Sequence, residues 1–248
     1  MRVYAVYSIK GGVGKTATAV NLADMAAHSG LRTLLWDLDP QGAASFYLRV
    51  KPKVKGGVEK ILEGRRNLRR WLRASDFENL HLLPADFSYR HIDLVLDAHK
   101  KPRKRLARLF APLSRRYDVI ILDCPPSVSL LSDSIFQASD AVVSPVIPTP
   151  LSLRCYFQLK DHLDELGKKA PLLLPFLAQV DRRKNLHRDI QDRLYKESPE
   201  FLESWIPAAS VVEQMGTQRG PLRAFAPSSQ SALAYASLWA ELDSAIPE

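Results

Sequence analysis

The chain has 248 residues, of which 46% are hydrophobic and 25% are charged; 35 Lys and Arg residues against 27 Asp and Glu residues give a formal charge of +8. This composition excludes a disordered chain, a collagen-like chain and a small disulfide-stabilised scaffold. The apolar stretches are shorter than the roughly 18 residues that a membrane-spanning helix needs, so we expect no stable membrane insertion. A strand-like run begins at Arg2 and leaves no room for a signal peptide, which predicts a cytoplasmic protein.

Short apolar runs rich in Val, Ile and Leu alternate along the chain with longer segments of helical period. The predicted strands are 2–8, 32–37, 80–83, 118–123, 141–147 and 172–178. The predicted helices are 15–29, 87–97, 103–116, 129–138, 152–166, 185–196 and 229–244. This alternation predicts an α/β fold with a doubly wound, mostly parallel sheet and helices on both faces. Because no Gly/Ser-rich or Pro-rich linker interrupts the pattern, we expect a single domain over 1–248.

The segment that follows the first predicted strand is rich in glycine and reads Ser-Ile-Lys-Gly-Gly-Val-Gly-Lys-Thr over residues 8–16. Glycines let a backbone curl so that its N–H groups face phosphate oxygens, and the next helix adds its positive end. In such a loop Lys15 reaches the β and γ phosphates, and the Thr16 hydroxyl binds Mg²⁺. The general pattern begins with Gly, where this chain has Ile9, and the loop carries an additional lysine, Lys10.

Two further motifs follow predicted strands. Asp37-Leu38-Asp39-Pro40-Gln41-Gly42 comes after the second strand, and Asp123-Cys124-Pro125-Pro126-Ser127 ends and follows the fourth. Together with the glycine-rich loop, they resemble the K-G-G-x-G-K-T, D-x-D-P-Q-G and D-x-P-P-S segments of the ParA/MinD family of deviant Walker A ATPases, and the likeness is greatest to Soj-like ParA proteins. Ile206-Pro207 and the last helix extend the resemblance over most of the chain. It implies a P-loop NTPase fold that binds ATP and Mg²⁺.

The resemblance also implies roles for individual residues. The nucleotide-binding residues would be Lys10, Gly11, Gly12, Val13, Gly14, Lys15, Thr16, Ala17 and Pro207, and the magnesium-binding residues would be Thr16, Asp39 and Asp123. The catalytic residues would be Lys15, Asp39, which positions the attacking water, and Lys10, which reaches the phosphates of a partner subunit in an ATP-bound homodimer. A capping role is the alternative for Asp39 and Asp123. For Asp37 a structural hydrogen bond is as good an interpretation as a functional one.

The positive charge is concentrated in two segments. Residues 51–73 carry a balance of +7, and residues 99–116 carry +8 with no acidic residue, which favours a polyanionic partner. We expect Arg103, Lys104, Arg105 and Arg108 on the outer face of one helix, and Arg65, Arg66, Arg69 and Arg70 in the other cluster.

Family members often bind DNA through Arg after the Ile-Pro dipeptide and Lys before the last helix. This chain has Ala208 and Pro227-Ser228-Ser229-Gln230 at those places. We therefore expect the DNA-binding surface to have moved to the two basic clusters, because counterion release rewards any clustered cationic face.

The sequence thus predicts a ParA-like ATPase that binds double-stranded DNA nonspecifically at the nucleoid. It would position a chromosome, plasmid or protein cargo with a ParB-like or other activating protein. The alternatives are a MinD-like ATPase that cycles on a membrane or protein matrix, and a relative that carries a metal or a tail-anchored protein. The MinD-like reading requires a basic amphipathic C-terminal helix, whereas here no Lys or Arg follows Arg223.

Overall fold

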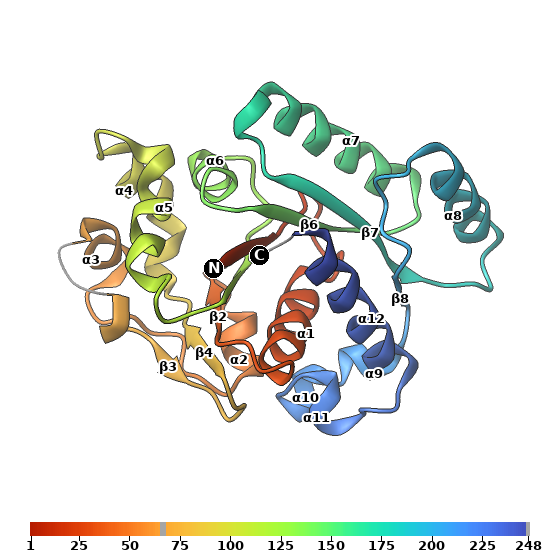
Figure 1. The fold of residues 1–248 in the computed structure, drawn as a ribbon, viewed down its shortest axis with the longest axis horizontal. Coiled ribbons are helices and arrows are strands. Elements are labelled where there is room, and N and C mark those ends of the chain that lie inside the picture. Colours follow the sequence, from red (N-terminus) through yellow and green to blue (C-terminus); the bar gives the residue numbers. More distant parts are fainter. Residues whose placement is uncertain (65–67, 247–248) are drawn as a thin grey trace.

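The computed structural model describes residues 1–64 and 68–246, and these form an eight-stranded sheet between two layers of helices (Figure 1). The strands are β1 (Arg2–Val6), β2 (Thr33–Asp37), β3 (Arg73–Ala74), β4 (Leu80–Leu83), β5 (Val119–Asp123), β6 (Ala141–Val146), β7 (Leu172–Val180) and β8 (Trp205–Pro207). Their order is β3-β4-β2-β5-β1-β6-β7-β8, and all neighbours are parallel except β3 with β4. The predicted α/β class with a mostly parallel sheet is confirmed.

Two helical layers cover the sheet. One layer contains α3 (Gly57–Glu63), α4 (Ile92–Asp97), α5 (Arg105–Phe110), α6 (Leu130–Phe136), α7 (Pro150–Glu165) and α8 (Asn185–Glu197). The other contains α1 (Lys15–His28), α2 (Ala43–Tyr47), α9 (Ser210–Glu213), α10 (Met215–Gln218), α11 (Leu222–Phe225) and α12 (Gln230–Ala245). Both faces of the central strands are therefore buried, which explains why these strands are continuous apolar runs.

The six predicted strands all form, and the segment predicted at 80–83 has the observed bounds. Short elements were not predicted: β3 and β8, and helices α2, α3, α9, α10 and α11. The last helix packs its apolar side into the core as expected, since Tyr235, Leu238, Trp239 and Leu242 are buried.

The prediction of one helix over 103–116 is wrong. The segment forms a 3₁₀ turn at Pro102–Lys104, the short helix α5, and a second 3₁₀ turn at Ala111–Leu113. Pro112 lacks an N–H group and cannot continue a regular helix, which accounts for the break. The apolar face is as predicted, because Leu106, Leu109, Phe110 and Leu113 are buried.

The expected outer face of four cations needs a related correction. Arg105 is half-buried, and its Nε donates to the carbonyl oxygen of Leu62. Arg103 and Lys104 lie on the 3₁₀ turn, and of the four only Arg108 points outward from α5 itself. In the other cluster, Arg65 and Arg66 lie outside the described residues.

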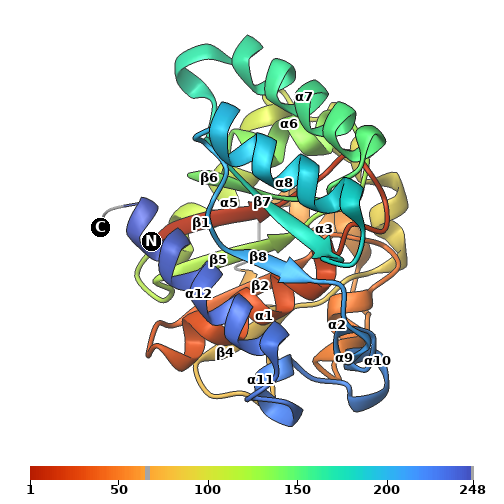
Figure 2. The same ribbon diagram turned by 90° about the vertical axis from the view of Figure 1, so that its right-hand side faces the viewer.

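All parallel strands end at the same edge of the sheet. Figure 2 shows their arrowheads pointing toward α2, α9 and α10, while both chain ends lie on the opposite side. β1 lies between β5 and β6, at the switch point of the topology. Helix α1, which follows β1, and helix α6, which follows β5, cover opposite faces of the sheet. Ligands of doubly wound sheets bind at this place. In the described ranges no helix is long and apolar enough to span a membrane.

Candidate active site

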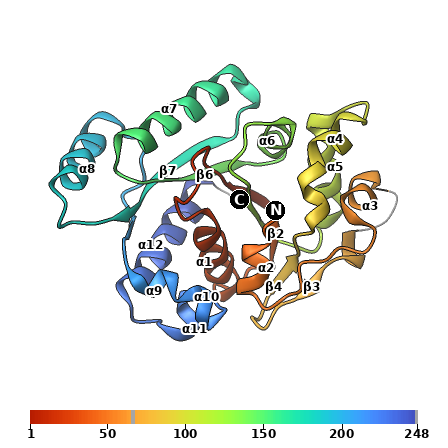
Figure 3. The ribbon, with the colours of Figure 1, turned by 180° about the vertical axis from the view of Figure 1, so that it is seen from behind.

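The loop between β1 and α1 lies at the centre of the carboxyl edge, as the view from behind in Figure 3 shows. Two of its glycines adopt the left-handed conformation that other residues rarely take: φ is +73° at Gly12 and +94° at Gly14, which caps α1. Within the described part of the chain, the backbone N–H groups of residues 11–14 donate no hydrogen bond. Successive free N–H groups at a helix N-terminus form a nest that suits a phosphate group.

Lys15, on the first turn of α1, places its ammonium group inside this site. Its side chain is buried, and its Nζ donates to the carbonyl oxygen of Lys10 at 3.3 Å. Burial lowers the pKa of Lys15, and the nearby carboxylates of Asp123 and Asp39 oppose that shift. A desolvated cation whose one hydrogen-bond partner among the described residues is neutral is well placed to gain from an anionic ligand.

Lys10 differs from Lys15 in its contacts. It is half-buried, and its side chain makes no hydrogen bond or ion pair with any residue that the structure describes. Its ammonium group is therefore available to a ligand or to a second protein chain.

Asp123 ends β5 directly beside the loop and is fully buried. Both of its carboxylate oxygens lack a hydrogen-bond partner among the described residues. Burial and the neighbouring Asp37 carboxylate raise the pKa of Asp123 well above its usual range. Two orphaned buried oxygens near Lys15 and Thr16 fit a hard cation such as Mg²⁺, so the capping alternative has no support at this residue.

The other two aspartates have different surroundings. Asp39 is half-buried just beyond β2, and its Oδ1 accepts a turn hydrogen bond from the Gln41 N–H at 2.9 Å. Its Oδ2 has no hydrogen-bond partner among residues 1–64 and 68–246 and can act on a ligand. Asp37 accepts two hydrogen bonds of 2.7 Å, from the N–H and the hydroxyl of Ser45. Ser45 in turn accepts from the N–H of Ala85, so Asp37 ties α2 to the segment after β4. These hydrogen bonds give Oδ2 of Asp37 a structural role, whereas its Oδ1 is buried without a partner among the described residues, so a functional role for Asp37 stays open.

A pocket of about 490 Å³ opens beside the loop. Its lining includes five of the predicted nucleotide-binding residues: Gly12, Val13, Gly14, Ala17 and Pro207. Three side chains that sequence reasoning missed also line it, namely Gln179, Glu213 and Tyr235. Gln179 lies at the carboxyl end of β7, and ligands of doubly wound sheets bind at the carboxyl ends of the strands. Nothing in the local sequence, however, distinguishes Gln179.

The chain is similar to known proteins in sequence. Residues 1–173 match the protein-family model described as "AAA domain". The chain is 31% identical to the sporulation initiation inhibitor protein Soj of Bacillus subtilis, over 97% of this chain and 98% of Soj. It is 33% identical to the chromosome partitioning protein ParA of Myxococcus xanthus, over 78% of this chain and 70% of that protein.

A solved structure is also similar. The crystal structure of cobyrinic acid a,c-diamide synthase from Mycobacterium smegmatis with bound ADP and magnesium has a TM-score of 0.81 and 27% sequence identity, and the match covers 98% of this chain and 94% of that one.

Proposed function

Because the chain belongs to the ParA/MinD family of P-loop ATPases, we propose that it is a ParA-like partition ATPase that dimerises around ATP and binds DNA nonspecifically to position a cargo. The observation that carries the proposal is the meeting of three motifs at one edge of the sheet: the loop after β1, Asp39 after β2 and Asp123 at the end of β5. Phosphoryl transfer needs positioning and charge neutralisation, and these residues supply both.

Each site residue has a role in this proposal. The free N–H groups of the loop and the Lys15 ammonium hold the phosphates, while Pro207 and Ala17 line the adjacent pocket. Thr16, Asp39 and Asp123 would hold Mg²⁺, which when bound would neutralise phosphate charge. Asp39 orients the attacking water, and Lys10 reaches a second subunit. The whole chain, 1–248, would act as one ATPase unit.

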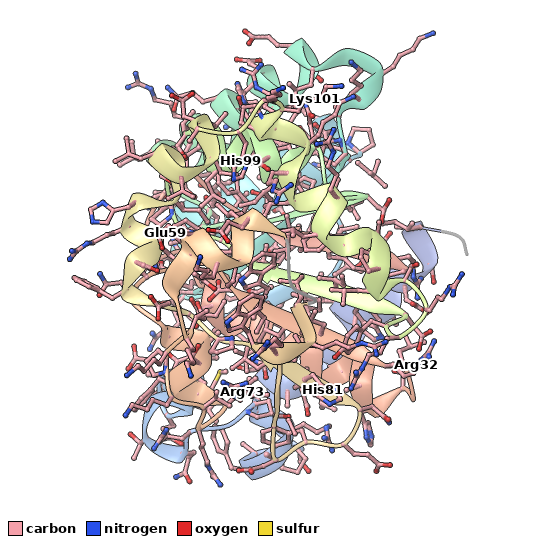
Figure 4. The ribbon with its side chains drawn as sticks, turned by 90° about the vertical axis from the view of Figure 1, so that its left-hand side faces the viewer. Arg32, Glu59, Arg73, His81, His99 and Lys101 are labelled. Atoms are coloured by element: carbon pink, nitrogen blue, oxygen red, sulfur yellow. The ribbon has the colours of Figure 1, made fainter. Side chains whose placement is uncertain are left out.

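For the DNA surface, the supporting observation is that the two basic segments come together in the fold. Arg105 of α5 donates to the Leu62 carbonyl at the end of α3. Burial raises the pKa of Tyr117, and the nearby Arg116 and Arg69, one from each segment, oppose that shift. Figure 4 shows the resulting face, with Lys101 and Arg73 toward opposite ends and Glu59 between them. We call this surface the basic face; its exposed cations include Lys53, Lys55, Arg70, Arg73, Lys100, Lys101, Lys104 and Arg108.

The cations near the last helices have intramolecular partners instead. Arg223 forms a two-bond ion pair with the buried Asp24, at 2.8 and 2.9 Å. Arg219 stacks on the Phe46 ring at 4.6 Å and donates to the Phe46 carbonyl. Ala208 and Ser228 are exposed and uncharged. These contacts favour the basic face over the place where family members often bind DNA.

A double charge reversal, Lys104→Glu with Arg108→Glu, tests whether the basic face binds DNA. Both side chains are exposed on the basic face, and among the described residues no hydrogen bond or ion pair joins either of them to a site residue. With ATP bound, plasmid affinity at low salt should fall by at least about tenfold, and the log–log salt slope should decrease by about 0.9 for each lost phosphate contact. ATP hydrolysis without DNA should not change. Gel retardation at several salt concentrations and phosphate release measure these effects.

The matched control is Lys168→Glu with Lys169→Glu, which alters the total charge equally on an exposed turn after α7. It should bind DNA almost as the unmodified protein does. If both double variants retard plasmid equally well, the basic face is not the DNA surface. If the unmodified ATP-bound dimer retards no DNA at low salt, a protein or lipid matrix replaces DNA in the proposed function.

A further inference from the structure

Gln179, near the end of β7, makes an unusual contact with the loop after β1. Its Nε2 donates to the carbonyl oxygen of Gly12 at 2.7 Å, across 167 positions of sequence. Its backbone is in the left-handed region, with φ of +52°, although it is neither Gly nor Asn. Left-handed residues of this kind persist where the surrounding structure enforces them, and they gather at functional sites.

The enforcing feature is a bulge in the pairing of β7 with β8. Leu177 pairs with Trp205 and Val180 pairs with Pro207, so β7 has one residue more than β8 over this stretch. Leu177 and Val180 consequently lie in the same apolar cluster, under α8, whereas Ala178 faces the opposite layer. Gln179 is the additional residue. A bulge of this type turns one side chain out of the alternating pattern, and here the side chain reaches the loop.

The contact fixes the direction of one N–H group. A trans peptide is planar, and its C=O and N–H point in opposite directions. Because Gln179 holds the Gly12 carbonyl, the N–H of Val13 in the same peptide must point to the opposite side, away from Gln179. That N–H donates no hydrogen bond to any residue within 1–64 or 68–246, and Val13 itself is fully buried. Without a tether, a peptide next to a glycine at φ of +73° can rotate at little cost.

We propose that Gln179 is a positioning residue of the ATPase site, which keeps the Val13 N–H aimed at the nucleotide phosphates by holding the Gly12 carbonyl. This inference rests on the proposed role of residues 10–16 as the phosphate loop. The alternative is that Gln179, which also lines the pocket beside the loop, serves only the base of the nucleotide.

The test compares Mg-ATP with Mg-tripolyphosphate, which has the phosphates and no base, in binding to Gln179→Leu and Gln179→Gly. Leucine removes the donor at similar size, and glycine also removes the strain of the positive φ. Loss of one neutral hydrogen bond should weaken both ligands by about 3- to 10-fold. The thermal midpoint of the unliganded Gln179→Gly protein should be equal to or above that of the unmodified protein. Calorimetry and thermal unfolding measure the two quantities.

A matched control is Asn79→Gly, which relieves a similar φ of +59° in the turn before β4, away from the loop, and should leave both affinities unchanged. The proposal is overturned if only Mg-ATP binding weakens, if neither ligand weakens, or if Gln179→Gly lowers the thermal midpoint together with affinity. If the unmodified protein binds neither ligand, the phosphate loop and the proposed function are both wrong. If the unmodified protein binds both ligands and the Gln179 variants bind them equally well, only the role of Gln179 is wrong.

Discussion

Lys15→Ala should lose ATP binding, whereas Asp39→Ala should bind ATP and Mg²⁺ but lose turnover. The Lys15 ammonium is buried at the loop, and no carboxylate of the described residues lies within hydrogen-bond reach of it, so its attraction to phosphate is little screened. Removing one partner of a desolvated charge pair weakens binding by about 100-fold or more. Asp39 is half-buried at the mouth of the site, and a residue that positions water contributes to turnover by about 100- to 10,000-fold.

Equilibrium binding of a fluorescent ATP analogue and the release of phosphate measure the two effects separately. Asp39→Asn is the useful control, because the amide oxygen can still accept the turn hydrogen bond from Gln41. The asparagine variant should therefore keep the loop intact and lose turnover as the alanine variant does. Asp39→Ala with normal turnover would refute the assigned role, and a normal ATP affinity in Lys15→Ala would refute the phosphate contact.

The sequence predicted the parts of the fold that have strong local signals. Buried parallel strands are continuous apolar runs, so Leu80–Leu83 and the other central strands could be identified directly. Elements of two to seven residues, such as β3 and α10, are too short to show a period, and their formation depends on packing against distant segments. Pro112, which can end a helix, is visible in the sequence. We nevertheless predicted one helix because the apolar spacing continues over 103–116.

The candidate site, like the fold, has features that the sequence predicts and features that it does not. Residues of the glycine-rich loop, Asp39 after β2 and Asp123 at the end of β5 could be proposed because their motifs are contiguous. Gln179 could not, because its orientation results from a register shift between β7 and β8 that involves residues far apart in the chain. The joining of the two basic segments into one face is also tertiary: it depends on α5 packing beside α3, more than 40 positions away.

The other large effect is expected on ATP-dependent dimerisation. If Lys10 acts across the interface, Lys10→Ala should bind ATP as a monomer and fail to dimerise. The reason is that its side chain has no partner within its own subunit, as far as the described residues show, so its removal costs the monomer little. In a dimer the same ammonium would meet the phosphates of the facing subunit, where a charged contact in a water-poor interface is worth far more than at a surface.

Light scattering with a nonhydrolysable ATP analogue distinguishes the two states. Lys10→Ala should remain at monomer mass at protein concentrations where the unmodified chain is dimeric, with ATP affinity for the monomer within a few-fold of normal. Lys100→Ala, which removes an exposed lysine of the basic face, is the matched control and should dimerise fully. Since two copies of the basic face on one body bind DNA more tightly than one, Lys10→Ala should also lose ATP-dependent DNA binding although its cations are intact. An undiminished ATP-dependent dimer in Lys10→Ala would mean that Lys10 belongs only to its own loop.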